Sequence, residues 1–264
     1  MHTAMAEKES RLMLLLNKVP EVTIAFWIIK IMSTTVGETG ADYLAVHVGL
    51  GTTATAAIMV IFLIAALIWQ VRAPRYTPWV YWLTVVLVSV VGTQITDFLT
   101  DKLEISLYVS TTIFGALLAL TFAVWYSVER TLSIHTIVTT RRELFDWGAI
   151  LFTVALGTAA GDLAPEALSL GFNIGVLAFG ALIGLIAAAY YLGANEVLTF
   201  WLAYILSRPL GASLGDLLSQ SREYGGVGLG TTYTSLAFLT VIVAFVALAS
   251  FSSIGTRRDR KTAD

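Results

Sequence analysis

The chain contains no cysteine, which excludes disulfides, thiolate chemistry and metal sites built on sulfur. Charged residues make up only 13% of the sequence, and a soluble domain needs more of them to cover its surface. The formal net charge is -2, so no basic surface is available for nucleic acid. The three histidines, His2, His47 and His135, lie far apart in the sequence and form no metal-ligand cluster.

Apolar residues are abundant instead: they make up 57% of the 264 residues, and the mean hydropathy is +0.79. A membrane-spanning helix needs about 20 mostly apolar residues. Eight segments meet this requirement, at residues 20–45, 51–72, 79–99, 107–127, 144–165, 169–191, 197–218 and 231–252. The composition therefore predicts an all-α integral membrane protein with eight transmembrane helices, and the first segment is expected to stay in place as an anchor.

Lysine and arginine in the short connections predict the orientation in the membrane. Twelve of these residues fall on one side: Lys8, Arg11, Lys18, Arg72, Arg75, Arg130, Arg141, Arg142, Arg257, Arg258, Arg260 and Lys261. The other side holds two, Lys102 and Arg222. Both termini are therefore expected on the cytoplasmic side, with the lipid bilayer as the surroundings of the helices.

An internal repeat organises the chain. Four windows show the same spacing of Trp, nine residues, Gly, four residues and Asp: "WIIKIMSTTVGETGAD", "WLTVVLVSVVGTQITD", "WGAILFTVALGTAAGD" and "WLAYILSRPLGASLGD". The signature residues are Trp27, Gly37 and Asp42; Trp82, Gly92 and Asp97; Trp147, Gly157 and Asp162; Trp201, Gly211 and Asp216. The repeated unit is a two-helix hairpin, so successive copies have the same orientation and form parallel repeats about an axis near the membrane normal.

This spacing divides the chain into a single membrane domain with polar ends. We place repeat 1 at residues 19–76, repeat 2 at 77–136, repeat 3 at 137–195 and repeat 4 at 196–253. Residues 1–18 and 254–264 form a cytoplasmic N-terminal segment and a cytoplasmic tail. The first helix of each repeat is expected to surround a common interior, with the second helices outside or between them.

Three segments are the most recognisable in the chain: "KVPEVTIAFWIIKIMSTTVGETGADYL", "ERTLSIHTI" and "WLAYILSRPLGASLGD". In these segments the chain resembles a family of bacterial inner-membrane proteins made of four tandem two-helix repeats of unknown function. The resemblance covers almost the whole chain. It implies the eight-helix repeat architecture and a bacterial membrane, and it implies no activity.

Polar residues of each repeat fall on one helix face. Counting back from each aspartate in steps of four gives Lys30, Thr34, Glu38 and Asp42; Val85, Ser89, Thr93 and Asp97; Ile150, Val154, Thr158 and Asp162; Tyr204, Arg208, Ala212 and Asp216. Residues four apart share a face, and charged groups in a span normally face the protein interior. The stripe therefore predicts an inward polar face, in which Lys30 and Arg208 each contact an acid.

The ends of the stripe have plainer interpretations as well. For the four tryptophans we favour an interfacial aromatic belt. The aspartates, at a helix end that disfavours negative charge, instead suggest a positive partner. Pro209 predicts a kink or break in the seventh helix, with a role either in transport or in packing alone. Glu129 and Glu196 could line an inner vestibule, but we favour their interpretation as ordinary charges at the membrane interface.

Several functions fit this pattern, and a transporter of a small hard cation fits best. Its predicted cation ligands are Asp42, Glu38, Asp97, Asp162, Asp216, Thr34, Thr93 and Thr158, with Glu38 and Asp42 as the principal metal ligands. Alternatives are a proton-coupled carrier of a small organic solute and a structural or sensory membrane protein. The "TTVG" segment does not repeat as a potassium filter would. No nucleophile–base pair is found, so we expect no enzyme and no cofactor, and the sequence leaves homo-oligomer formation open.

Overall fold

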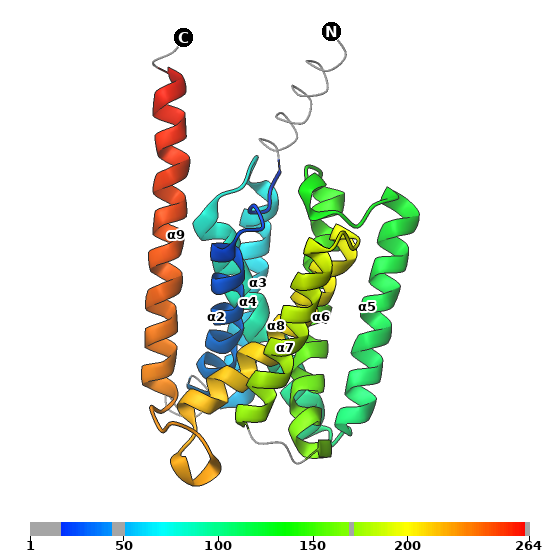
Figure 1. The fold of residues 1–264 in the computed structure, drawn as a ribbon, viewed down its shortest axis with the longest axis vertical. Coiled ribbons are helices and arrows are strands. Elements are labelled where there is room, and N and C mark those ends of the chain that lie inside the picture. The colour runs from blue at the N-terminus through cyan, green and yellow to red at the C-terminus, as the bar shows by residue number, and fades with distance from the viewer. Residues whose placement is uncertain (1–16, 44–50, 169–171, 262–264) are drawn as a thin grey trace.

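The computed structural model describes residues 17–43, 51–168 and 172–261 (Figure 1). The described part is helical and contains eight long helices. They are α2 (Ile24–Asp42), α3 (Thr52–Arg72), α4 (Pro78–Asp97), α5 (Leu107–Glu129), α6 (Thr140–Leu168), α7 (Phe172–Tyr191), α8 (Glu196–Ser219) and α9 (Thr231–Lys261). Short helices η2 (Phe98–Lys102), η3 (Ile134–Thr136) and η4 (Arg222–Tyr224) lie in the connections. The eight segments expected from hydropathy are therefore all helices.

The sequence supplies start signals for several of these helices. The Thr23 hydroxyl accepts a hydrogen bond from the Phe26 N–H, and the Asn195 side chain accepts one from the Leu198 N–H. Ser106 caps α5 in the same way through Tyr108. Pro78 lies in the first turn of α4, where no N–H donor is needed. These residues explain why the helices begin close to the predicted positions.

Among the described residues, seven helices, α3 to α9, are long and apolar enough to cross a membrane. Within the described residues, α2 contains a shorter apolar helical stretch at Ile24–Gly37. Helix α8 continues through Pro209 as one helix, so the predicted break at this proline does not occur.

Four inner helices form a closed ring. Helix α2 packs against α4 and α8, and α6 packs against the same two helices. Figure 1 shows that α2, α4, α6 and α8 all start at the same end of the bundle. The first helices of the four repeats therefore surround one axis.

The outer helices pack with an offset of one repeat. Helix α3 packs on α4, α5 on α6, and α7 on α8, while α9 packs on α2 and closes the circle. Each outer helix thus contacts chiefly the inner helix of the next repeat and makes few contacts with its own. The start of the described chain and the end of α9 lie at the same end of the bundle (Figure 1).

The segment before α2 is fixed to two other repeats by a buried polar network. The Lys18 ammonium donates to the Glu143 carboxylate at 2.8 Å and to the Val71 carbonyl at 2.9 Å. Gln70 donates to the other Glu143 oxygen at 3.0 Å. The end of α3 and the segment before α2 are thereby held against the start of α6.

Candidate functional site: the axis of the inner ring

The inner helices present their residues to the axis in register. We name the layers by their distance before each repeat aspartate. The aromatic layer, sixteen residues before, contains Phe26, Tyr81, Asp146 and Phe200; the lysine layer, twelve before, contains Lys30, Val85, Ile150 and Tyr204; the arginine layer, eight before, contains Thr34, Ser89, Val154 and Arg208; the threonine layer, four before, contains Glu38, Thr93, Thr158 and Ala212. All described members are buried except the half-buried Phe200. The predicted inward stripe is therefore correct for these layers.

The repeat glycines allow neighbouring inner helices to approach closely. A Cβ atom on Gly92 would lie 2.5 Å from Val154 Cγ1, and one on Gly157 would lie 2.6 Å from Arg208 Cβ. A Cβ on Gly37 would overlap Ser89, and one on Gly211 would overlap Thr34. Each glycine thus packs against the arginine-layer residue of the next repeat around the ring. This explains the fixed position of Gly in all four windows.

The repeat tryptophans follow the same circular rule. The ring centroids of Trp82 and Phe26 lie 5.6 Å apart, those of Trp147 and Tyr81 5.4 Å apart, and those of Trp27 and Phe200 5.7 Å apart. Trp82, Trp147 and Trp27 therefore each pack on an aromatic ring of the preceding repeat. Trp82, Trp147 and Trp201 are only 3–4% exposed. The interpretation of these three as an interfacial belt is wrong, because they belong to the packed core.

Arg208 lies at the centre of the ring and is completely buried. Its guanidinium donates to the Thr34 carbonyl at 3.4 Å, to the Thr158 hydroxyl at 2.8 Å and to the Thr93 hydroxyl. These three oxygens come from α2, α6 and α4, one from each of the other repeats. The Arg208 guanidinium of repeat 4 is thus held by oxygens of repeats 1, 2 and 3. We call these three oxygens the oxygen cage.

Lys30 lies one layer closer to the aromatic end and is 1% exposed. Its ammonium group lies 4.4 Å from the ring centroid of Tyr204, which belongs to the same layer. Among the described residues it has no hydrogen-bond partner. The predicted acid partner is therefore not found among Asp97, Asp162 and Asp216. For Arg208 the acid partner stays a prediction.

The sequence analysis missed Asp146 in the aromatic layer. This acid is 2% exposed and lines a small cavity of about 10 Å³ together with Tyr81, Tyr204 and Trp201. Within the described part of the chain, one oxygen of Asp146 and the Tyr204 hydroxyl have no hydrogen-bond partner. One further step of four residues along the stripe would have reached Asp146, because it lies four residues before Ile150.

The predicted cation ligands at the other end differ from one another. Asp97 and Asp216 are half-buried and Asp162 is exposed. The side chains of Glu38 and Asp42, the predicted metal ligands, lie outside the described residues. In the part that the structure describes, no three His, Asp or Glu side chains are grouped as a metal site. Whether the four aspartates bind an ion together stays a prediction.

Two larger cavities lie away from the axis. One, of about 390 Å³, is lined by Asp97, Asp101 and Lys102 with residues of α3, and neither Asp162 nor Asp216 lines it. The second, of about 600 Å³, lies between α2, α7 and α8. His135 and Glu196, 3.2 Å apart, contribute its polar groups. Both cavities are lined mainly by apolar side chains.

The acids suggested for an inner vestibule have nearby partners. Glu129 accepts hydrogen bonds from Arg141 at 2.6 Å and from Arg142 at 2.7 Å. Glu196 lies beside His135. Both acids therefore belong to charge pairs at helix ends, and their place at a membrane interface stays a prediction.

Comparison with known proteins identifies the repeat. No curated protein and no solved structure matches the chain. A family model described as "Repeat of Unknown Function (DUF347)" matches residues 25–76, 80–131 and 199–254. These segments contain the inner and outer helices of repeats 1, 2 and 4, and repeat 3 has the same Trp, Gly and Asp spacing and the same place in the ring. Because the matched segments cover more than half of the chain, the protein belongs to this family of repeats of unknown function.

Proposed function

We propose that the protein is a transporter of a small hard cation, which passes along the axis of the inner ring across a bacterial inner membrane. The observation that carries this proposal is the oxygen cage around Arg208. Burying an arginine in a membrane protein is costly, and here the guanidinium is completely buried at the point where all four repeats meet. We infer that Arg208 is a tethered cation, which occupies a site that a transported cation takes in another conformation.

The chemistry of the cage supports a hard cation. Its described oxygens are two threonine hydroxyls and one backbone carbonyl. Hard cations such as Mg²⁺, Mn²⁺ and Na⁺ prefer oxygen ligands. The chain has no cysteine for softer metals. The described axis is closely packed, so the proposal requires a movement that withdraws Arg208 when the cation enters.

The aspartate layer supports the same function from one end of the axis. Asp97, Asp162 and Asp216 are all at least partly exposed. Acids at the mouth of a path raise the local concentration of cations and favour their entry. We therefore assign this end of the ring to cation capture, with the side that faces the cell exterior given by the charge bias of the connections.

A second candidate is a carrier of a small organic solute. The cavity of about 600 Å³ between α2, α7 and α8 favours it, because cavities of about 300–1,000 Å³ hold ligands of that size. The wall is mainly apolar, and the His135–Glu196 pair supplies polar groups that fix an orientation. Binding measurements separate the two candidates, since one requires cation binding and the other requires binding of an organic compound.

The test is cation flux in proteoliposomes that contain the purified full-length protein. Initial rates of Mn²⁺, Mg²⁺ and Na⁺ movement are measured for the wild type, Arg208→Gln and Arg141→Gln. Arg208→Gln removes the tethered cation, and we expect a rate about tenfold lower, because losing charge-assisted hydrogen bonds changes a barrier by at least about 1.4 kcal/mol.

Arg141→Gln is the matched control, because this arginine is exposed and bonds Glu129 outside the ring. It should transport at the wild-type rate. Equal rates in all three proteins would exclude the oxygen cage as the transport site. Absence of cation flux in the wild type would exclude the proposed function, and binding of an organic solute would then favour the second candidate.

A further inference from the structure

Asp146 interrupts the fourfold pattern at the aromatic end. The other three repeats place aromatic rings in this layer, Phe26, Tyr81 and Phe200, and each ring packs against the tryptophan of the following repeat. Repeat 3 places a carboxyl group there, and this carboxyl and Trp201 line the same cavity. An aromatic side chain would preserve the packing that the other repeats use. The acid therefore suggests a role other than packing.

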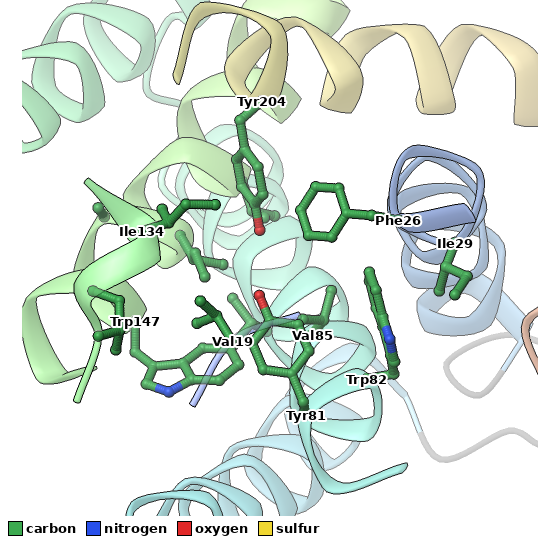
Figure 2. Packing of buried hydrophobic residues seen from close by; sticks show 14 of the residues in the cluster. Val19, Phe26, Ile29, Tyr81, Trp82, Val85, Ile134, Trp147 and Tyr204 are labelled. Carbon is green, nitrogen blue, oxygen red and sulfur yellow. The ribbon is translucent and has the colours of Figure 1, made fainter. Parts of the chain in front are cut away.

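The cavity beside Asp146 suits one water molecule. Its volume of about 10 Å³ is close to the roughly 10–15 Å³ that a single water needs. Polar groups face it from two further helices: Tyr81 of α4 and Tyr204 of α8 line it, and Figure 2 shows their hydroxyl groups pointing toward one another. A water also needs polar partners. The Asp146 oxygen and the Tyr204 hydroxyl that lack partners in the described structure provide them.

The charged and titratable groups around Asp146 are few. Tyr81 lies on α4 and Tyr204 on α8, and the Lys30 ammonium of α2 lies over the Tyr204 ring. On its own helix Glu143 lies one turn earlier, where Lys18 neutralises it. The η3 segment contributes the apolar Ile134 to the cavity, and the neighbouring His135 contacts Glu196. Within the described residues, no cation forms an ion pair with Asp146.

We propose that Asp146 is a proton-binding site, which exchanges its proton through a water in the cavity that it shares with Tyr81 and Tyr204. The carboxyl O–H bond breaks when the proton moves to the water, and the carboxylate keeps the electron pair. The reverse transfer restores the acid. The Tyr204 hydroxyl orients the water, and the Lys30 ammonium lies over the ring of the same tyrosine.

Proton binding at Asp146 would allow a proton gradient to drive the proposed cation transport. A proton that binds at Asp146 changes the charge on the same axis that holds Lys30 and Arg208, so it alters the electrostatic cost of admitting another cation. We infer that proton movement and cation movement in opposite directions are coupled through these layers. This coupling rests on the proposed transport function, whereas proton binding by Asp146 does not.

Infrared difference spectroscopy on the full-length protein in lipid tests proton binding directly. Spectra are compared across the pH range in which the protein stays folded, in H₂O and in D₂O. We expect a carbonyl band of a protonated, buried carboxyl group, with a shift in D₂O. The band should disappear in Asp146→Asn and remain in Asp101→Asn, which removes an exposed carboxyl group at the other end of the ring.

Two conservative variants guard against a folding defect in Asp146→Asn. Asp146→Glu keeps the carboxyl group and should move the band rather than remove it. Tyr204→Phe keeps the ring and removes the hydroxyl, so the band should shift in frequency. A band that is unchanged in Asp146→Asn and Asp146→Glu, or the absence of any band that responds to pH, would overturn the assignment.

The coupling has a separate readout in proteoliposomes. A pH gradient should accelerate cation flux several-fold in the wild type and leave flux through Asp146→Asn unaffected. Equal acceleration in both proteins would overturn the coupling. If the wild type shows no flux while the infrared band behaves as expected, the proposed transport function fails and the proton site stands.

Discussion

The two ends of the inner ring are built differently, although the same four helices form both. At the aromatic end, large rings of one repeat pack on those of the next, and Trp82, Trp147 and Trp201 are buried. At the aspartate end, the side chains of Asp97, Asp162 and Asp216 reach the surface in part. The inner helices of repeats 2, 3 and 4 are thus packed into the core at one end and partly exposed at the other. In this structure the axis is closed at the aromatic end.

In the aromatic, lysine and arginine layers, one member of each layer carries a buried charge. Lys30, Arg208 and Asp146 belong to repeats 1, 4 and 3, while the equivalent positions in other repeats are apolar, aromatic or hydroxyl-bearing. A symmetric scaffold therefore carries an asymmetric set of charges. Packing explains what the repeats share, and function is the better explanation for how they differ.

The largest effect is expected where the aromatic end is weakened. Trp82→Ala should lower the free energy of unfolding by about 3–5 kcal/mol, because it leaves a cavity beside Phe26 and Tyr81. Trp79→Ala is the control: this tryptophan lies on the same helix but is 44% exposed. Unfolding in mixed detergent micelles measures both. Equal losses would mean that the aromatic end is not the core of the ring.

A hydroxyl of the oxygen cage should matter next. Thr158→Val keeps the shape of the side chain but leaves an N–H of Arg208 without this acceptor. We expect a loss of about 1.5–3 kcal/mol, which is typical of a hydrogen bond to a charged group. Thr121→Val removes a hydroxyl that bonds only the Leu117 carbonyl of its own helix. If the two variants unfold alike, the cage does not hold the guanidinium as described.

The close approach of the inner helices can be tested at a repeat glycine. A Cβ added by Gly211→Ala would lie 2.8 Å from the Ile31 carbonyl oxygen, so the helices must separate. Such overpacking costs about 1–3 kcal/mol. Gly180→Ala on the outer helix α7 adds a methyl group where no atom lies within 4 Å. It should leave stability unchanged or raise it by up to about 1 kcal/mol, through better helix propensity. The opposite order of melting temperatures would contradict the packing rule.

Changes at the aspartate end should affect stability least and transport most. Partly exposed charges are removed by three substitutions: Asp97→Asn, Asp162→Asn and Asp216→Asn. We expect each to change the free energy of unfolding by no more than about 0.5 kcal/mol. Each should reduce cation flux in proteoliposomes, and Asp42→Asn should reduce it most. Undiminished flux in a variant with all four substitutions would remove the aspartate layer from the transport path.

The sequence by itself determined the helices, the repeat and the inward face. Three local signals placed all eight helices: spans of about 20 apolar residues, caps such as Thr23 and Asn195, and the fixed Trp–Gly–Asp spacing. The step of four residues assigned Lys30, Thr93, Thr158 and Arg208 to one buried face, because helical periodicity needs no knowledge of neighbouring helices.

Only the tertiary structure decided which repeats meet and at what height. The offset that places Gly157 against Arg208, and the outer helix of one repeat on the inner helix of the next, follows from the fit of small residues to large ones between helices. The same fit buries the tryptophans, although a tryptophan at a helix start equally suits a membrane interface. It also places Lys30 over the Tyr204 ring, and Asp146 beside the same cavity as Tyr204. The sequence does not predict these contacts, because partners from different helices have no fixed spacing in it.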